Sequence, residues 1–320
     1  MPLRNSPILA LLATGLLTVL APAGWAQRDS GAVFRADTRL VVLHASVVDK
    51  NGNLVTGLPE SAFTVYENGV KQEIKLFRQE DVPVSMGLII DDSGSMRDKR
   101  RKVESAALTL VKKSNPQDEV FIVNFNDEAY LDVDFTNDIN KMEEGLARID
   151  SRGGTAMRDA LSMSIDYLLQ HAKRDKKVLL VVTDGNDNTS NISLEKLVHK
   201  AQQSEVLIYA VGLLNQEQKR ERKRARRALD ALTKASGGLA YYPESLEEVE
   251  QITSKVAHEI RNQYVIAYSP ANPQLDGSYR RIKVDVRAKG KPMVRTRSGY
   301  YATPIVPGTA TLDKSASSSD

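Results

Sequence analysis

The 320-residue sequence contains no cysteine, only four histidines and a single tryptophan. Without cysteine the chain has no disulfide, zinc–thiolate site, iron–sulfur cluster or thiol nucleophile. Four histidines leave little material for a histidine-rich metal site. An excess of one charge is also lacking, because 44 Lys and Arg against 41 Asp and Glu give a net charge of +3. That charge is too small to indicate a nucleic-acid partner.

Long apolar runs are absent apart from one near the start of the chain. Residues 8–20 are almost wholly apolar, Arg4 precedes them, and the small residues Gly24 and Ala26 follow. This pattern predicts a secretory signal peptide at 1–26, and its apolar run is too short for a comfortable membrane span. We therefore expect an exported chain (periplasmic, cell-surface or secreted) with no transmembrane span after signal removal. Export without cysteine indicates a bacterial envelope protein.

What is present is an ordinary globular composition, 41% hydrophobic and 27% charged, in a length that suits about two domains. Over 83–262, apolar strand-like runs alternate with helix-like stretches, which predicts an α/β fold with a doubly wound, mostly parallel sheet and helices on both faces. The strand-like runs lie at 84–90, 120–125, 130–135, 178–182, 206–211 and 239–242. Helical spacing recurs at 102–113, 139–149, 156–170, 194–203, 218–235 and 246–262.

Two β-rich segments, 27–82 and 263–302, flank the α/β region. Their strand candidates lie at 38–48, 62–66, 72–77, 264–268, 281–286 and 293–297. Neither segment is large enough to bury a core alone, so we expect them to pair into one small antiparallel β-sandwich, with 27–82 as its immunoglobulin-like half. Residues 303–320, rich in Ser, Thr and Ala, are predicted to form a disordered tail.

Polar residues stand where two of the predicted parallel strands end. The sequence Asp-Asp-Ser-Gly-Ser at 91–95 follows one strand, Thr-Asp-Gly at 183–185 follows another, and Gly-Gly-Thr at 153–155 opens a helix. Ligands of open α/β sheets bind beyond the carboxyl ends of the strands, so these loops converge if the two strands are neighbours. Carboxylates and hydroxyls without His or Cys form a hard-oxygen site that suits Mg²⁺ or Mn²⁺. Two carboxylates neutralise such a cation and leave it able to accept one more anionic oxygen.

The pattern Asp91-x-Ser93-x-Ser95, followed by Thr155 and Asp184, resembles the metal-ion-dependent adhesion site of von Willebrand factor type A domains. The resemblance covers about 83–262. The flanking sequences at 51–69 and 297–301 are similar to those of an exported von Willebrand-related family found especially in acidobacteria.

The resemblance implies a role for each of the five residues as a ligand of Mg²⁺, with Mn²⁺ or Ca²⁺ as alternatives. Ser93 and Ser95 would bind the metal directly, and Thr155 would do so when a partner is engaged. Asp91 and Asp184 would bind it directly or through water. The remaining position would take an Asp or Glu carboxylate of a protein partner, which makes the chain a metal-dependent adhesion module. The alternative is an envelope scaffold with a vestigial metal site.

Other interpretations of these residues are weaker. The sequence from Asp184 to Glu195 half-matches an EF-hand loop but lacks its glycine, and Asp187 is expected in a solvated turn. Ser93 lacks the Gly-x-Ser-x-Gly context of a nucleophile and has no histidine near in sequence. The pair at 258–259 lacks the second histidine of a zinc protease, and Gly57 lacks the following lysine of a phosphate-binding loop. We therefore expect no enzymatic activity.

The densest charge block is Lys-Arg-Glu-Arg-Lys-Arg-Ala-Arg-Arg at 219–227. Seven basic residues in nine cover most of the circumference of a helix, which predicts a solvated helix. A second interpretation is that it docks to anionic lipid, polysaccharide or an acidic protein. A nucleic-acid partner conflicts with the predicted export.

Overall fold

A computed structural model of the chain describes residues 40–303, except 80, 148–150 and 186. The predicted signal peptide at 1–26 and the tail from 304 onwards lie outside the described residues. Within the described part, no helix is both long and apolar enough to cross a membrane.

The centre of the fold is a six-stranded sheet with the strand order β10-β9-β8-β5-β6-β7. Its parallel strands are β5 (Val84–Asp91), β6 (Glu119–Phe125), β8 (Lys176–Thr183), β9 (Leu207–Gly212) and β10 (Ala240–Tyr241). The edge strand β7 (Ala129–Thr136) runs antiparallel to β6. Every residue of β5, β6 and β9 is buried, which explains why these strands appear in the sequence as continuous apolar runs.

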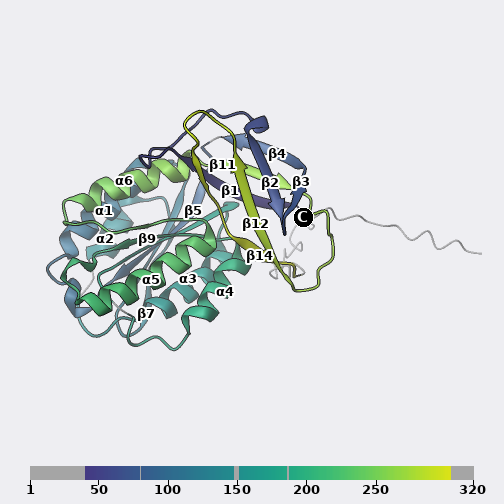
Figure 1. Ribbon diagram of the computed structural model, residues 1–320. Coiled ribbons are helices and arrows are strands. Elements are labelled where there is room, and N and C mark those ends of the chain that lie inside the picture. Colours follow the sequence, from purple (N-terminus) through teal and green to yellow (C-terminus); the bar gives the residue numbers. More distant parts are fainter. Residues whose placement is uncertain (1–39, 80, 148–150, 186, 304–320) are drawn as a thin grey trace, which may run out of the picture. The chain divides into compact units, whose positions relative to one another are not determined.

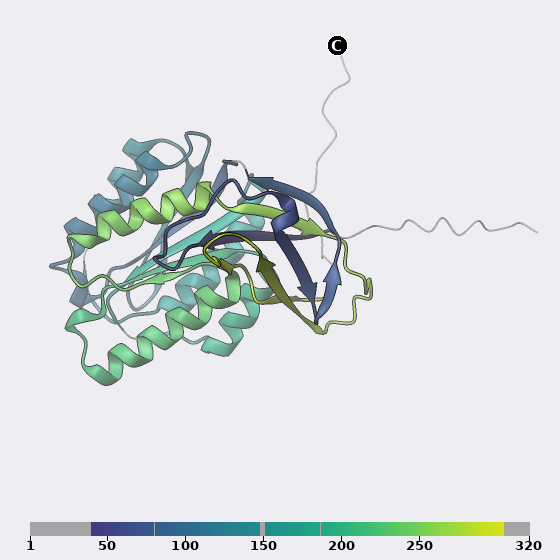
Figure 2. The same cartoon turned by 45° about the horizontal axis from the view of Figure 1, so that its top comes forward.

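In the part of the chain that the structure describes, six α-helices cover the two faces of this sheet, as the sequence predicted (Figure 1). They are α1 (Arg100–Lys113), α2 (Ile139–Ala147), α3 (Met157–His171), α4 (Leu194–Ser204), α5 (Lys219–Ser236) and α6 (Glu248–Arg261). One face packs against α1, α2 and α6, and the other packs against α3, α4 and α5. The turned view keeps α6 and α5 on opposite sides of the strands (Figure 2).

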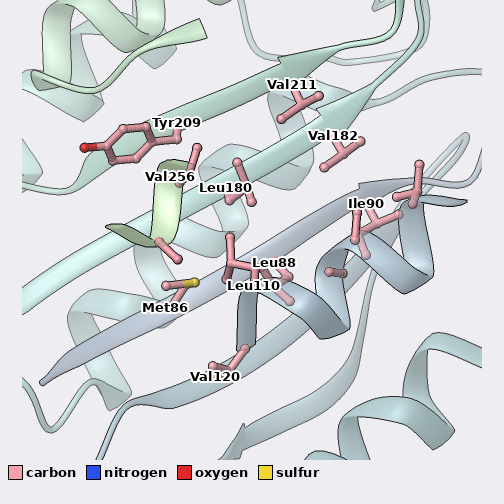
Figure 3. Close-up of a cluster of buried hydrophobic side chains, with 14 of the residues drawn as sticks. Met86, Leu88, Ile90, Leu110, Val120, Leu180, Val182, Tyr209, Val211 and Val256 are labelled. Atoms are coloured by element: carbon pink, nitrogen blue, oxygen red, sulfur yellow. The ribbon is translucent and has the colours of Figure 1, made fainter. Parts of the chain in front are cut away.

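Successive side chains of a strand point to opposite faces of the sheet, so the apolar core consists of one cluster on each face. Leu88 and Ile90 belong to the α1/α6 cluster, whereas Ile89 between them belongs to the α3/α5 cluster. Figure 3 shows the first cluster, in which Leu180 and Val182 of β8 continue the layer formed by β5. This two-sided packing fixes β5 and β8 as neighbours at the middle of the sheet.

The flanking segments form two four-stranded antiparallel sheets, in the orders β13-β1-β11-β4 and β14-β12-β2-β3. Their strands are β1 (Val41–Val48), β2 (Phe63–Glu67), β3 (Val70–Gln72), β4 (Ile74–Gln79), β11 (Tyr264–Tyr268), β12 (Tyr279–Val286), β13 (Met293–Arg295) and β14 (Gly299–Tyr301). Both sheets mix strands from the two ends of the chain, with β1 beside β11 and β2 beside β12. The predicted pairing of the flanks is therefore confirmed.

A shared apolar core explains why the flanking segments pair. Leu43, Val65 and Ile266, which come from both segments, are buried in one cluster. The sequence missed β14, and it treated 72–77 as one strand where the structure ends β3 at Gln72 and begins β4 at Ile74.

Three short 3-10 helices lie in the connections between the strands and α-helices of the described residues, and a glycine ends α5. The 3-10 helices are η1 (Glu60–Ala62), η2 (Gly94–Met96) and η3 (Leu214–Gln216). Gly237 ends α5 with φ of +94°, and a Cβ atom there would lie 2.5 Å from the backbone nitrogen of Arg297. Only glycine fits both the left-handed conformation and this close approach.

Candidate functional site

The site lies at the carboxyl ends of β5 and β8. Ile90 pairs with Val182 in the parallel register, and both side chains lie at the same end of the buried cluster (Figure 3). The next residues, Asp91 and Thr183, therefore end the two strands side by side. The Thr183 hydroxyl donates a hydrogen bond of 2.5 Å to Asp91 Oδ2. The sequence placed Asp91 at this edge but missed Thr183 as its partner.

A chain of hydroxyls joins the loop after β5 to the loop after β8. The Ser93 backbone nitrogen donates to Asp91 Oδ1 at 2.9 Å, which turns the loop back toward the strand. The Oγ atoms of Ser93 and Ser95 lie 3.2 Å apart, and Ser95 Oγ donates to Asp184 Oδ1 at 2.8 Å. Four of the five predicted site residues, Asp91, Ser93, Ser95 and Asp184, are thus brought together by hydrogen bonds.

Thr155 joins this group through the backbone of its loop. The Gly94 nitrogen donates to the Gly153 carbonyl oxygen at 3.3 Å, which holds the 153–155 loop against the serine loop. The Thr155 nitrogen donates to Asn188 Oδ1 at 2.8 Å, and the side chain of Thr155 is buried. All five predicted residues are therefore at one edge of the sheet.

Asp127 explains why glycines precede Thr155. Its Oδ1 atom accepts a hydrogen bond of 2.7 Å from the Gly154 nitrogen. Gly153 has φ of +75°, and a Cβ atom at this position would lie 2.1 Å from Asp127 Oδ2. The Gly-Gly pair lets the backbone approach this carboxylate, which the sequence did not identify.

Two neighbouring carboxylates have other partners. Asp92 Oδ1 accepts a hydrogen bond of 2.8 Å from Ser151 Oγ, in the segment that leads to Gly153. Asp187 forms a salt bridge of 2.8 Å with Arg158 and also accepts from Ser190 Oγ at 2.7 Å. The expectation of a freely solvated turn at Asp187 is therefore wrong. Asn186 of the EF-hand-like pattern lies outside the described residues.

The electrostatics of the site are dominated by burial. Burial raises the pKa of Asp91 to about 6, while hydrogen bonds from Ser93 and Thr183 oppose the shift and the charge of Asp184 adds to it. Burial and then Asp184 raise the pKa of Glu217, and Lys99 opposes that shift. The site therefore gathers more negative charge than its surroundings readily solvate.

One cation already contacts this charge. The Lys99 ammonium is buried and donates to Asp184 Oδ2 and, at 3.3 Å, to the Ser95 carbonyl oxygen. Sequence reasoning missed this lysine. The local sequence gives no signal for it, because its partner Asp184 lies 85 residues away.

The donor set fits a hard divalent cation. Two carboxylates, Asp91 and Asp184, lie with the three hydroxyls of Ser93, Ser95 and Thr155 at one edge of the sheet. Across the described residues, no group of three or more His, Asp or Glu side chains is placed to hold a metal. Hydroxyl oxygens would therefore have to supply part of any coordination here, which Mg²⁺ accepts.

The basic segment 219–227 lies in the first half of α5, and all seven of its Lys and Arg residues are exposed. Within the described part of the chain, Arg226 is the member with an ion-pair partner, Asp230 at 4.0 Å. The predicted solvated helix is confirmed. The segment that connects β9 to α5 begins beside the site, because the Leu213 nitrogen donates a hydrogen bond to the Thr183 carbonyl oxygen at 2.8 Å.

Comparison with known proteins gives one family match and several distant relatives. The model of the von Willebrand factor type A domain matches residues 86–256, more than half of the chain. Inter-alpha-trypsin inhibitor heavy chain H4 from Bos taurus is 24% identical over 147 residues, 41% of this chain and 16% of that protein. An uncharacterized protein from Borreliella burgdorferi is 28% identical over 104 residues, 32% of this chain and 30% of that protein.

The chain thus matches less than a third of the length of either relative. A solved structure, a von Willebrand factor type A protein from Catenulispora acidiphila, has 13% sequence identity and a TM-score of 0.49. The similarity covers 83% of this chain and 75% of that one. The acidobacterial family of exported proteins stays a prediction.

Proposed function

Because the chain belongs to the von Willebrand factor type A domain family, we propose that it is a protein-binding module that uses a divalent cation. In this proposal a cation held at the carboxyl edge of the sheet bridges to an Asp or Glu carboxylate of a protein partner. The activity is binding rather than catalysis. The observation that carries it is the continuous hydrogen-bonded chain from Ser93 through Ser95 to Asp184 beside Asp91.

The residues that would hold the cation are Asp91, Ser93, Ser95, Thr155 and Asp184. The cation, most suitably Mg²⁺ with Mn²⁺ or Ca²⁺ as alternatives, would supply a positive centre for one external carboxylate oxygen. The chain's own groups position these donors. Thr183 and the Ser93 nitrogen orient the Asp91 carboxylate, and Asn188 fixes the backbone of Thr155.

The surroundings favour an acidic partner. The segment that leads into α5 starts beside Thr183, and the seven exposed basic residues at 219–227 follow within one helix. A partner that presents one carboxylate to the cation would meet these positive side chains with its neighbouring acidic groups. Such charges increase the rate of association more than they increase affinity.

The predicted signal peptide supports a location outside the cytoplasm, in the periplasm, at the cell surface or in the medium. There the chain would act as an adhesion or assembly module. A second candidate, a scaffold with a vestigial metal site, is favoured by one observation, which is the contact between Lys99 and Asp184.

Calorimetric titration with Mg²⁺ and Mn²⁺ tests the proposal. The wild-type chain is expected to bind one cation, and Asp91→Ala and Thr155→Ala are expected to abolish or strongly weaken binding. An acidic Glu-rich peptide is then titrated with cation and with chelator. Peptide binding that is equal in both conditions would support the scaffold, whereas binding lost in chelator would support the metal-bridged module.

A further inference from the structure

Lys99 occupies an unusual position for a lysine, at the point where the loop after β5 becomes α1. Its side chain is 7% exposed, and the partner Asp184 is 1% exposed. The two residues lie 85 positions apart, so the fold rather than local sequence brings them together. Buried lysines are rare unless they are paired, and this one is paired with a carboxylate of the candidate metal site.

Both oxygens of Asp184 are engaged within the chain. Oδ1 accepts the Ser95 hydroxyl at 2.8 Å, and Oδ2 accepts the Lys99 ammonium. Among the described residues, Asp184 has no salt-bridge partner other than Lys99. A metal ion that uses Asp184 must therefore share it with Lys99 or displace the ammonium.

We propose that Lys99 is a tethered cation that competes with divalent metal for Asp184 and so sets the metal affinity of the site. This inference rests on the proposed function and names a residue that regulates the same site. In the absence of metal, the ammonium offsets part of the charge of Asp91 and Asp184 and holds the loops in place. When metal arrives, the like charges repel, so binding is weaker than the donor set alone would give.

The chain also offers the displaced ammonium another acceptor. A Cβ atom at Gly185, the residue after Asp184, would lie 3.6 Å from Glu217 Oε1. Glu217 is half-buried beside the loop after β8, and the charges of both Asp184 and Lys99 affect the pKa of its carboxyl. The flexible four-carbon stem of a lysine lets its ammonium move from Asp184 toward Glu217 without a change in the backbone of α1. The exchange would therefore be reversible.

The test compares the full chain with Lys99→Met and Lys99→Gln, which remove the charge, and with Lys99→Arg, which keeps it. The probe is Mn²⁺ alone, measured by calorimetry after removal of metal with chelator. We expect Lys99→Met and Lys99→Gln to bind Mn²⁺ about tenfold more tightly than the wild type, and Lys99→Arg to stay within about twofold of it. In chelator, both charge-removing variants should melt at a lower temperature, and Mn²⁺ should restore the loss.

Lys102→Met is the matched control, because it removes an exposed lysine from the same helix. It is expected to change neither affinity nor melting temperature. Equal or weaker Mn²⁺ binding in both Lys99→Met and Lys99→Gln would overturn the role of Lys99 while leaving the proposed function intact, provided the wild type binds. Absence of Mn²⁺ binding in every variant would overturn both, and would favour the scaffold.

Discussion

The two ends of the central sheet bury the same kinds of charged residue but give them different partners. At the amino end lie Asp118, Glu119 and Lys176, and at the carboxyl end lie Asp91, Asp184 and Lys99. Each end therefore buries at least two carboxylates and one lysine, and the carboxyl end also buries Asp92. The difference between the two ends lies in what each charge contacts.

At the amino end most partners are backbone groups. Asp118 accepts hydrogen bonds from the nitrogens of Val84 at 2.8 Å and Asn115 at 3.1 Å. Glu119 Oε1 accepts from the Lys173 nitrogen at 2.7 Å and from the Ser85 hydroxyl at 2.6 Å. The Lys176 ammonium donates to the carbonyl oxygen of Ile260. Such partners stay in place unless the fold opens, so these charges are structural.

At the carboxyl end most partners are side chains. Asp91 Oδ2 accepts from Thr183, and the two oxygens of Asp184 accept from Ser95 and Lys99. A hydroxyl rotates and a lysine moves at little cost to the backbone, so these carboxylates are open to an external ligand. Exchangeable partners, rather than burial or charge alone, therefore distinguish a binding site from a structural ion pair.

The largest effect is expected from the pH dependence caused by Lys176. Burial lowers the pKa of this lysine to about 8, with Asp81, Asp118 and Glu259 opposing the shift. Between pH 8 and its ordinary value near 10.5, the unfolded chain binds the proton more tightly than the folded one. Stability from this group therefore rises with pH over that window, by about 3 kcal/mol in free energy of unfolding.

Urea unfolding of wild type and Lys176→Met at pH 7 and pH 10 measures this effect. Relative to the wild type, the free energy of unfolding of Lys176→Met should be higher at pH 7 than at pH 10. The difference between the two chains should change by about 3 kcal/mol between these pH values. Lys196→Met, which removes an exposed ammonium of α4, should leave the wild-type profile unchanged. If the difference in free energy of unfolding between wild type and Lys176→Met were the same at both pH values, burial would not lower the pKa of Lys176.

A smaller loss is expected from Glu119→Ala. The substitution leaves the Lys173 nitrogen and the Ser85 hydroxyl without their carboxylate acceptor, which should lower the free energy of unfolding by about 2 kcal/mol. Glu119→Gln keeps an acceptor oxygen and should cost less than half as much. Urea unfolding of both, beside the exposed control Glu143→Ala, checks the order. A loss no greater than that of the control would remove the structural role assigned to the amino end.

The central sheet can be predicted from the sequence, because strands buried on both faces must be continuously apolar. Burial on both faces requires the apolar runs of β5 and β8, and parallel neighbours require their polar carboxyl ends to meet. This placement predicts that the polar loops converge, and the resemblance to von Willebrand factor type A domains supplies the five candidate metal ligands. The flanks were predicted less fully, because strands of three residues such as β3 and β14 are too short to show a clear alternating pattern in the sequence.

Lys99 and Thr183 could not be predicted in the same way. A lysine at the start of a helix that follows a polar loop usually faces solvent, and nothing local to Lys99 indicates Asp184. Thr183 ends an apolar strand, where a threonine is ordinary. Their roles become visible only when β5 and β8 are placed side by side, because the partner of each lies more than 80 residues away.

The smallest expected effect has the opposite sign and lies at the carboxyl end. Burial raises the pKa of Asp91 to about 6, so the folded state binds its proton more tightly than the unfolded state. The contribution of this group to stability therefore falls as pH rises from about 4 to 6, and the penalty is fully present at pH 7. Asp91→Asn removes this penalty of about 3 kcal/mol but loses one of the two oxygens that accept from Ser93 and Thr183, so in chelator at pH 7 we expect a net gain of about 1 kcal/mol.

Thermal unfolding in chelator at pH 7 and pH 4.5 separates this explanation from a simple packing effect. The gain from Asp91→Asn should shrink at pH 4.5, where the folded wild type already carries a proton on Asp91. The exposed control Asp98→Asn should show neither change. A variant that is less stable at pH 7 would place Asp91 with the structural carboxylates of the amino end. A variant that gains stability while losing Mn²⁺ binding would show that the Asp91 carboxylate destabilises the metal-free fold. This result is expected if the carboxylate serves to bind a ligand.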